Sequence, residues 1–135
     1  MPDRPPREVR FVRTELEPLL HTDSCRVRVH LVRPPMETFV GTADGSCEGA
    51  DALRCAANAA ADALRKAMGP ADVTLEIQDI NLVRGVGLDV VMVSVGATYD
   101  NVTRQLVGVC PGREDAVRAA ALAVLNATNR FLGVG

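Results

Sequence analysis

Alternating apolar and polar residues predict strands along much of the chain. The alternation is clearest in residues 25–32, where Val27, Val29 and Leu31 fall on one face and Arg26, Arg28 and His30 on the other. Residues 89–98 show the same period of two. Because successive side chains of a strand point to opposite faces, each segment predicts a half-buried strand. Further strands are predicted at residues 9–16, 36–42, 73–83 and 102–110, with a loop at 43–49.

Two longer segments have the spacing of amphipathic helices, residues 49–68 and 113–132. Their apolar stripes recur at intervals of three and four residues: Leu53, Ala56, Ala57, Ala60 and Leu64, then Val117, Ala120, Ala121, Val124, Thr128 and Phe131. This spacing places one apolar face against a core. Gly69 and Pro70 are typical residues at which a helix stops.

The two halves of the chain repeat one pattern at a shift of 64 residues. Eight of the 19 positions from Asp51 to Gly69 are identical to their counterparts in the second half. The strand residues Val27 and Val29 fall on Val91 and Val93 at the same shift. The pair Val40-Gly41 matches Val107-Gly108 at a shift of 67. Agreement between strands and helices on one period indicates an internal duplication.

The predicted fold class is α+β, a duplicated βββα unit with antiparallel sheet or sheets and two helices packed on one face. Two such units form either one six-stranded sheet or two three-stranded sheets. The predicted boundaries are a disordered tail at 1–8, a first unit at 9–69 and a second unit at 70–135, all in one compact domain.

Composition narrows the classes of function. The 135 residues are 47% apolar but only 3% aromatic, and the formal net charge is −2. Scattered arginines and a single lysine give no basic surface for nucleic acid. No apolar run is long enough for a transmembrane helix or a signal peptide, so no membrane partner and a cytoplasmic location are expected. Cysteines in that compartment are expected to stay reduced.

The outer sheet faces differ between the halves. The first half carries Arg26 and His30 there, whereas the second carries Val90 and Met92. An apolar outer face at Val90 and Met92 predicts a subunit interface, and hence a homodimer. The alternative is that the helix of the other unit covers this face.

The loops before the two helices are the candidate ligand site. The residues that mark them are Gly45, Gly49 and Asp51 in the first half, and Gly108, Gly112 and Asp115 in the second. Unpaired N–H groups at a helix start can hold a small carboxylate, and glycines admit a ligand to the backbone. Ordinary turn glycines and first-turn acids explain the same residues.

The sequence gives little support for a metal site or a catalytic site. Cys25 and His30 lie at an odd separation on one strand, so their side chains point apart and predict no metal site. No nucleophile stands beside a base in a known motif, so no enzyme and no cofactor are expected. Cys47 and Cys110 precede the helices, where a thiol is either activated or an ordinary loop residue.

The last helix carries a family resemblance. The run Glu114-Asp115-Ala116-Val117-Arg118-Ala119-Ala120-Ala121-Leu122-Ala123-Val124-Leu125-Asn126-Ala127-Thr128-Asn129-Arg130-Phe131-Leu132 resembles the end of the C-terminal regulatory domain of 2-isopropylmalate synthase. The start of the earlier helix, Gly49-Ala50-Asp51-Ala52-Leu53, is also similar. That family's domain is a pair of βββα units that binds leucine and lies at a dimer interface. The resemblance therefore implies this fold, a dimer and an amino-acid effector.

Together these features predict a stand-alone regulatory module that senses a small metabolite, with an amino acid as the first candidate. The alternative is a protein–protein adaptor or dimerisation module without a small ligand.

Overall fold

The computed structural model describes residues 8–69, 72–85, 87–112 and 115–133. Apart from Glu8, the disordered tail predicted for residues 1–8 lies outside this range. So do Pro70, the middle residue of the turn at 85–87, and Arg113, where the second helix was predicted to begin.

Six strands and two helices follow one another in the predicted order. They are β1 (Arg10–Pro18), β2 (Ser24–Arg33), β3 (Glu37–Ser46), α1 (Gly49–Met68), β4 (Val73–Gly85), β5 (Leu88–Tyr99), β6 (Val102–Pro111) and α2 (Ala116–Leu132). Each half is therefore a βββα unit, as the repeat indicated.

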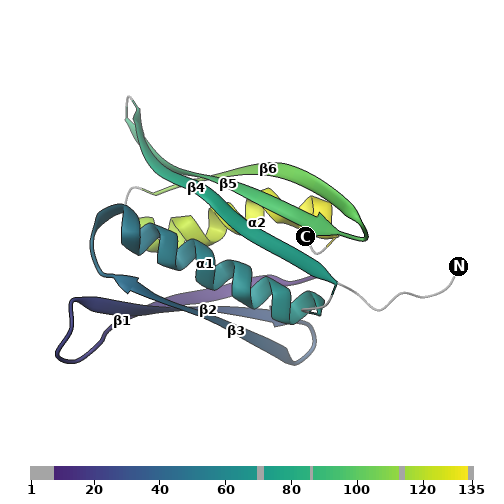
Figure 1. The fold of residues 1–135 in the computed structure, drawn as a ribbon, viewed down its shortest axis with the longest axis horizontal. Helices are drawn as coiled ribbons and strands as arrows, with labels where there is room; N and C mark the ends of the chain where they lie inside the picture. The colour runs from purple at the N-terminus through teal and green to yellow at the C-terminus, as the bar shows by residue number, and fades with distance from the viewer. Residues whose placement is uncertain (1–7, 70–71, 86, 113–114, 134–135) are drawn as a thin grey trace, which may run out of the picture.

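The strands form two separate antiparallel sheets, with strand orders β1-β2-β3 and β4-β5-β6. Figure 1 shows the two sheets on opposite sides of a layer made by the two helices. α1 packs on β2 and β3 of its own sheet and reaches β4 of the other, while α2 packs on β5 and β6 and reaches β1. Each sheet thus has helices on one face only, and the single six-stranded sheet does not form.

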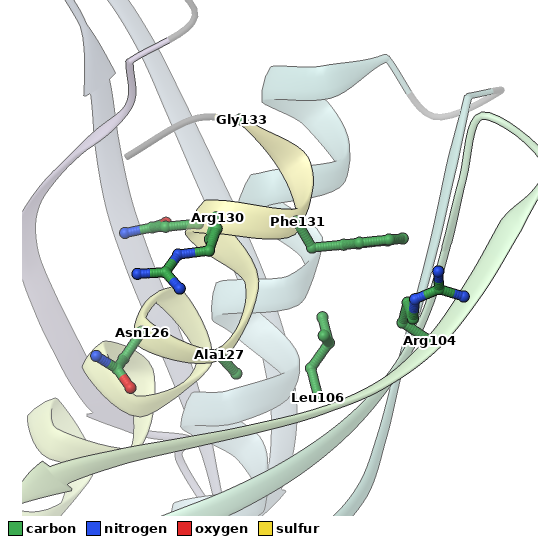
Figure 2. Close-up of a pocket in the computed structure, with 8 residues that line it drawn as sticks. Arg104, Leu106, Asn126, Ala127, Arg130, Phe131 and Gly133 are labelled. Carbon is green, nitrogen blue, oxygen red and sulfur yellow. The ribbon is translucent and has the colours of Figure 1, made fainter.

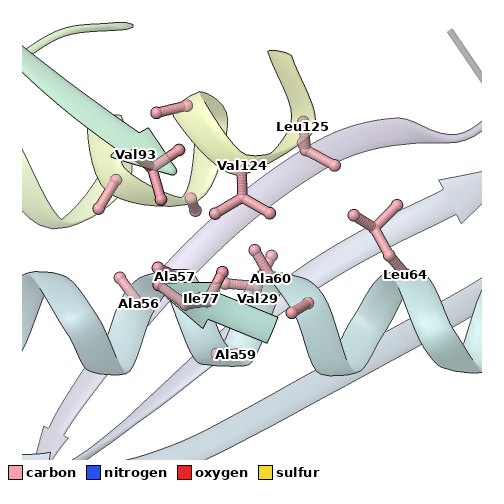
Figure 3. Packing of buried hydrophobic residues seen from close by; sticks show 14 of the residues in the cluster. Val29, Ala56, Ala57, Ala59, Ala60, Leu64, Ile77, Val93, Val124 and Leu125 are labelled. Atoms are coloured by element: carbon pink, nitrogen blue, oxygen red, sulfur yellow. The ribbon is translucent and has the colours of Figure 1, made fainter. Parts of the chain in front are cut away.

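The core is built from valines of the sheets and alanines of the helices. Figure 3 shows Val124 of α2 directed toward α1, where Ala57 and Ala60 lie. Val29 and Val93, the central inward residues of the two sheets, are completely buried. Alanine side chains allow the helix backbones to come close to both sheets, so the three layers pack together with few large side chains. None of the helices in the described ranges is long and apolar enough to cross a membrane.

The predicted loop at 43–49 is wrong for its first four residues. β3 continues to Ser46 because Ala43 pairs with Val27 and Ser46 with Ser24 along β2. The second helix is also shorter than predicted, since it begins at Ala116 after an N-cap at Asp115.

Two glycines show that the repeat is also a repeat in space. A Cβ built on Gly41 would overlap the backbone of Ala59 and Ala63, and one built on Gly108 would overlap Ala123 and Ala127. These helix residues are exact counterparts at the shift of 64, and the glycines are counterparts at the shift of 67. The strand and helix of each unit therefore cross at the same point, with backbone against backbone.

Candidate functional site

The glycines predicted to line a ligand site mostly serve packing. Gly45 lies within β3, where an added Cβ would overlap the Cys55 sulfur atom. Gly108 lies against the backbone of α2. Gly112 is buried, and an added Cβ would lie 2.9 Å from Val91 Cγ2. These three positions are filled by the protein's own atoms and leave little room for a ligand.

The remaining predicted residues lie at the helix starts. Gly49, with a φ of 58°, is the first residue of α1, and nothing lies within 4 Å of the Cβ that it lacks. Asp51 is exposed in the first turn. Asp115 caps α2, because its Oδ1 accepts a hydrogen bond of 3.0 Å from the N–H of Arg118. Capping accounts for Asp115, while a ligand-binding role at these starts stays a prediction.

A hollow of about 890 Å³ lies at the C-terminal half of α2, away from the predicted loops. Its lining comes from β6 and from the last two turns of the helix: Arg104, Leu106, Asn126, Ala127, Asn129, Arg130, Phe131 and Gly133. Figure 2 shows Asn126 and Arg130 stacked on one side of α2, with Leu106 and Phe131 on the other side, toward Arg104. The hollow therefore has a polar side and an apolar side.

Helix and strand periodicity place these side chains. Asn126 and Arg130 are four residues apart and share one face of α2. Arg104 and Leu106 are two residues apart on β6, so both point to the sheet face that carries the helix. The Phe131 ring is held edge-on by Tyr99, with ring centroids 6.4 Å apart.

The polar side of the hollow offers hydrogen-bond donors. The amide oxygen of Asn126 accepts a hydrogen bond of 3.3 Å from the N–H of Val109, which leaves its NH₂ group for other partners. Arg104 donates to the carbonyl oxygen of its neighbour Thr103. Neither Arg104 nor Arg130 forms an ion pair with any residue in the described part of the chain.

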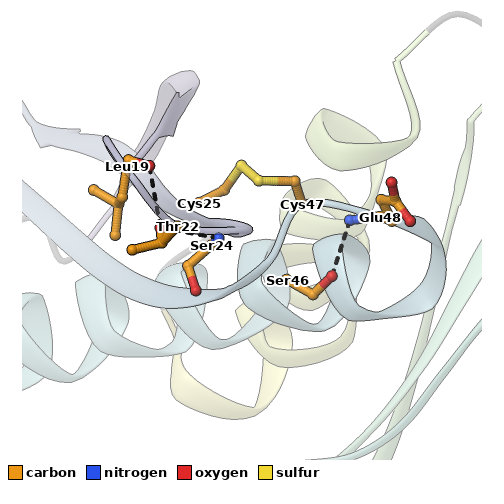
Figure 4. The surroundings of a disulfide bond; sticks show 7 residues. All are labelled: Leu19, Thr22, Ser24, Cys25, Ser46, Cys47 and Glu48. Carbon is orange, nitrogen blue, oxygen red and sulfur yellow. Dashed lines mark hydrogen bonds between the residues drawn. A yellow bond between two sulfur atoms is a disulfide. The ribbon is translucent and has the colours of Figure 1, made fainter.

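A disulfide joins Cys25 at the start of β2 to Cys47 after β3 (Figure 4), with the two Cα atoms 5.0 Å apart. The expectation that all cysteines stay reduced is therefore wrong for this pair. Cys55 and Cys110 are free. Burial raises the pKa of both thiols, which opposes the idea of an activated thiol at Cys110.

Around Met92 the outer face of the second sheet is apolar, as predicted, and no helix in the described ranges covers it. Met92 is 41% exposed and Val90 is half-buried. Exposed valines on the neighbouring strands extend this surface: Val83, Val107 and Val109. We call these five residues the apolar face. The alternative, in which the helix of the other unit covers it, is wrong because both helices lie on the inner side.

The outer face of the first sheet is crossed by ion pairs instead. Arg26 contacts Asp44 at 2.8 Å, and Arg28 contacts Glu17 at 2.6 Å. His30 contacts the Glu15 carboxylate, and its hydrogen bond holds the pKa of Glu15 below the usual value. The charged side chains named here are therefore paired with one another across β1, β2 and β3.

Comparison with known proteins adds no family: no protein-family model and no curated protein matches the chain.

Proposed function

We propose that the chain is a non-catalytic module that binds a small metabolite, with an amino acid as the first class to try. The hollow between β6 and α2 carries this proposal. Its volume of about 890 Å³ lies in the range of small-molecule sites. An apolar wall with a few polar groups at one side is the usual composition of such sites. The resemblance to the regulatory domain of 2-isopropylmalate synthase supports the same function and suggests leucine among the first compounds.

A thermal-shift screen tests this function directly. The screen takes the twenty amino acids, their α-keto acids and common small metabolites at millimolar concentration. A ligand that binds only the folded chain raises its melting temperature. An absence of any shift across the set would sink the proposal.

Chemical-shift mapping then separates the two candidate locations. A ligand in the hollow perturbs the amides of β6 and of residues 126–133. A ligand at the helix starts perturbs the surroundings of Gly49, Asp51 and Asp115 instead, which would restore the site predicted from the sequence.

The apolar face favours a second function, homodimerisation or docking of another protein. Isolated surface apolar residues need no explanation, but a contiguous patch on three strands is typical of an interface. Light scattering on the purified chain tests the homodimer. Met92→Glu should convert a dimer to a monomer, whereas Met36→Glu makes the same substitution at an exposed position in the β2–β3 turn of the first sheet and should not. A wild-type monomer contradicts the homodimer.

The cytoplasmic location is also a proposal, and the Cys25–Cys47 disulfide weighs against it. Disulfides persist mainly in oxidising compartments. Alkylation of free thiols in intact cells, followed by mass spectrometry, decides the matter. Because Cys25 and Cys55 are buried, the labelling is completed by lysis into denaturant that contains the alkylating reagent. Four labelled cysteines then support a reducing compartment, and two labelled cysteines contradict it.

A further inference from the structure

The internal duplication allows the hollow to be compared with its counterpart in the first unit. Asn126 and Arg130 correspond to Asp62 and Lys66 at the shift of 64. The matched crossings at Gly41 and Gly108 show that the two positions are equivalent in space. The same place in the fold therefore occurs twice with different side chains.

In the first unit the two side chains at these positions, Asp62 and Lys66, neutralise each other. The Asp62 carboxylate accepts a hydrogen bond of 3.0 Å from the N–H of Thr42. It also pairs with Lys66 at 3.2 Å, and Lys66 donates to the carbonyl oxygen of Val40. The helix anion thus binds the edge of β3 and neutralises the cation one turn later.

In the second unit the strand contact is kept but the charge is lost. Asn126 accepts from the N–H of Val109, the counterpart of Thr42, just as Asp62 does. The neutral amide offers Arg130 no negative charge, and Arg130 has no ion pair among the described residues. One helix turn thus presents the Arg130 guanidinium and the Asn126 NH₂ group as donors, and both border the hollow.

We propose that the hollow binds an organic anion whose acidic group lies against Arg130 and Asn126 and whose apolar part lies against Leu106 and Phe131. An external carboxylate supplies the negative charge that Asp62 supplies to Lys66 in the first unit. Arginine binds carboxylates through paired hydrogen bonds, which makes it suited to this role. Arg104 supplies a second positive charge at the β6 side. This inference rests on the proposed function and specifies the charge of the ligand.

Isothermal titration with matched probes tests the charge requirement on the full chain. The probes are 4-methylpentanoate, its uncharged analogue 4-methylpentanamide, and inorganic phosphate. We expect the acid to bind at least tenfold more tightly than the amide and than phosphate, which lacks the apolar part. Equal or tighter binding of the amide overturns the charge requirement, and equal or tighter binding of phosphate overturns the apolar contact. No binding of the acid at about 10 mM overturns the proposal as a whole.

The substitution Asn126→Asp builds the ion pair of the first unit into the second. The aspartate still accepts from the N–H of Val109, so the fold is retained, but it neutralises Arg130 and repels the probe. We expect binding of 4-methylpentanoate to weaken at least tenfold. Asp62→Asn is the matched control in the first unit and leaves binding unchanged. Unchanged binding in Asn126→Asp contradicts the inference.

The two levels of the proposal fail differently. If the metabolite screen yields a neutral or cationic ligand whose signals map to the hollow, the module binds a metabolite and the anion inference is wrong. If no compound in the screen shifts the melting temperature, the proposed function is wrong as well.

Discussion

Replacing Gly108 with alanine tests whether backbone contact between strand and helix fixes the fold. The added Cβ would lie 2.6 Å from Ala127 N and 2.8 Å from Ala127 Cβ, and it would overlap the carbonyl oxygen of Ala123. Favourable carbon contacts lie at about 3.5–4.0 Å, so β6 and α2 must separate by roughly 1 Å. The obstructing atoms belong mostly to a helix backbone, which has no rotamer to change.

We expect Gly108→Ala to lower the free energy of unfolding by about 3 kcal/mol, the upper part of the range for overpacked cores. In a chain of this length that loss lowers the melting temperature by roughly 10 °C. Urea unfolding followed by circular dichroism measures both wild type and variant. Gly41→Ala, the counterpart in the first unit, should lose a similar amount.

Gly96→Ala is the control, because it lies on β5 and its added Cβ meets only the end of the flexible Gln78 side chain, 2.7 Å from Nε2. Its stability should stay within about 0.5 kcal/mol of wild type. If Gly108→Ala is as stable as wild type, or if Gly96→Ala loses as much, then close approach does not explain the glycine at the crossing.

Two further predictions concern the first unit. Opening the disulfide with reductant, or Cys25→Ser with Cys47→Ser, should cost about 3 kcal/mol for a separation of 22 residues, and urea curves that coincide with and without reductant would contradict this. The Arg26 hydrogen bond holds the pKa of Asp44 below its ordinary 3.8, so this pair stabilises the fold above that pH and the contribution disappears as pH falls through the lowered pKa. The stability difference between wild type and Asp44→Asn should therefore shrink on acidification below about pH 3.8, and a difference that does not change with pH would refute the assignment.

The fold could be predicted because the periodic pattern and the repeat carry the same information. Val27 and Val29 on one strand, and their counterparts on β5, define the buried faces without any knowledge of the tertiary structure. What could not be predicted is how the units combine, since two separate sheets and one joined sheet bury the same residues. The arrangement depends on α1 and α2 packing against each other, and their alanines permit both outcomes.

The disulfide could have been inferred from the spacing of Cys25 and Cys47 in the β2–β3 hairpin. In the β2–β3 hairpin Cys25 pairs with Gly45, which places Cys47 only two residues from the position opposite Cys25. The register follows from the turn between the strands, but the sequence pattern ends the strand at residue 42 and predicts a loop at Cys47. In a reducing compartment neither thiol is expected to pair.

Differences between the two repeated units also indicate where the hollow lies. Identical residues in the two units mark positions that hold helix against strand, such as Gly41 and Gly108. A ligand site in only one unit would show as side-chain differences at positions where the packing of the two units is the same. The changes from Asp62 to Asn126 and from Lys66 to Arg130 are differences of this kind.

The two units allow the structural role and the proposed ligand-binding role to be tested separately within one chain. Asp62 and Asn126 do the same structural work, because each accepts the N–H of an edge strand. Each exchange keeps the strand contact and changes only surface ion pairs, so a structural role alone predicts small stability changes, at most about 1 kcal/mol, and no change in ligand binding. A ligand role predicts that the two exchanges diverge in binding while they agree in folding. The pair of variants therefore distinguishes an Arg130 that only contacts solvent from an Arg130 that binds an anionic ligand.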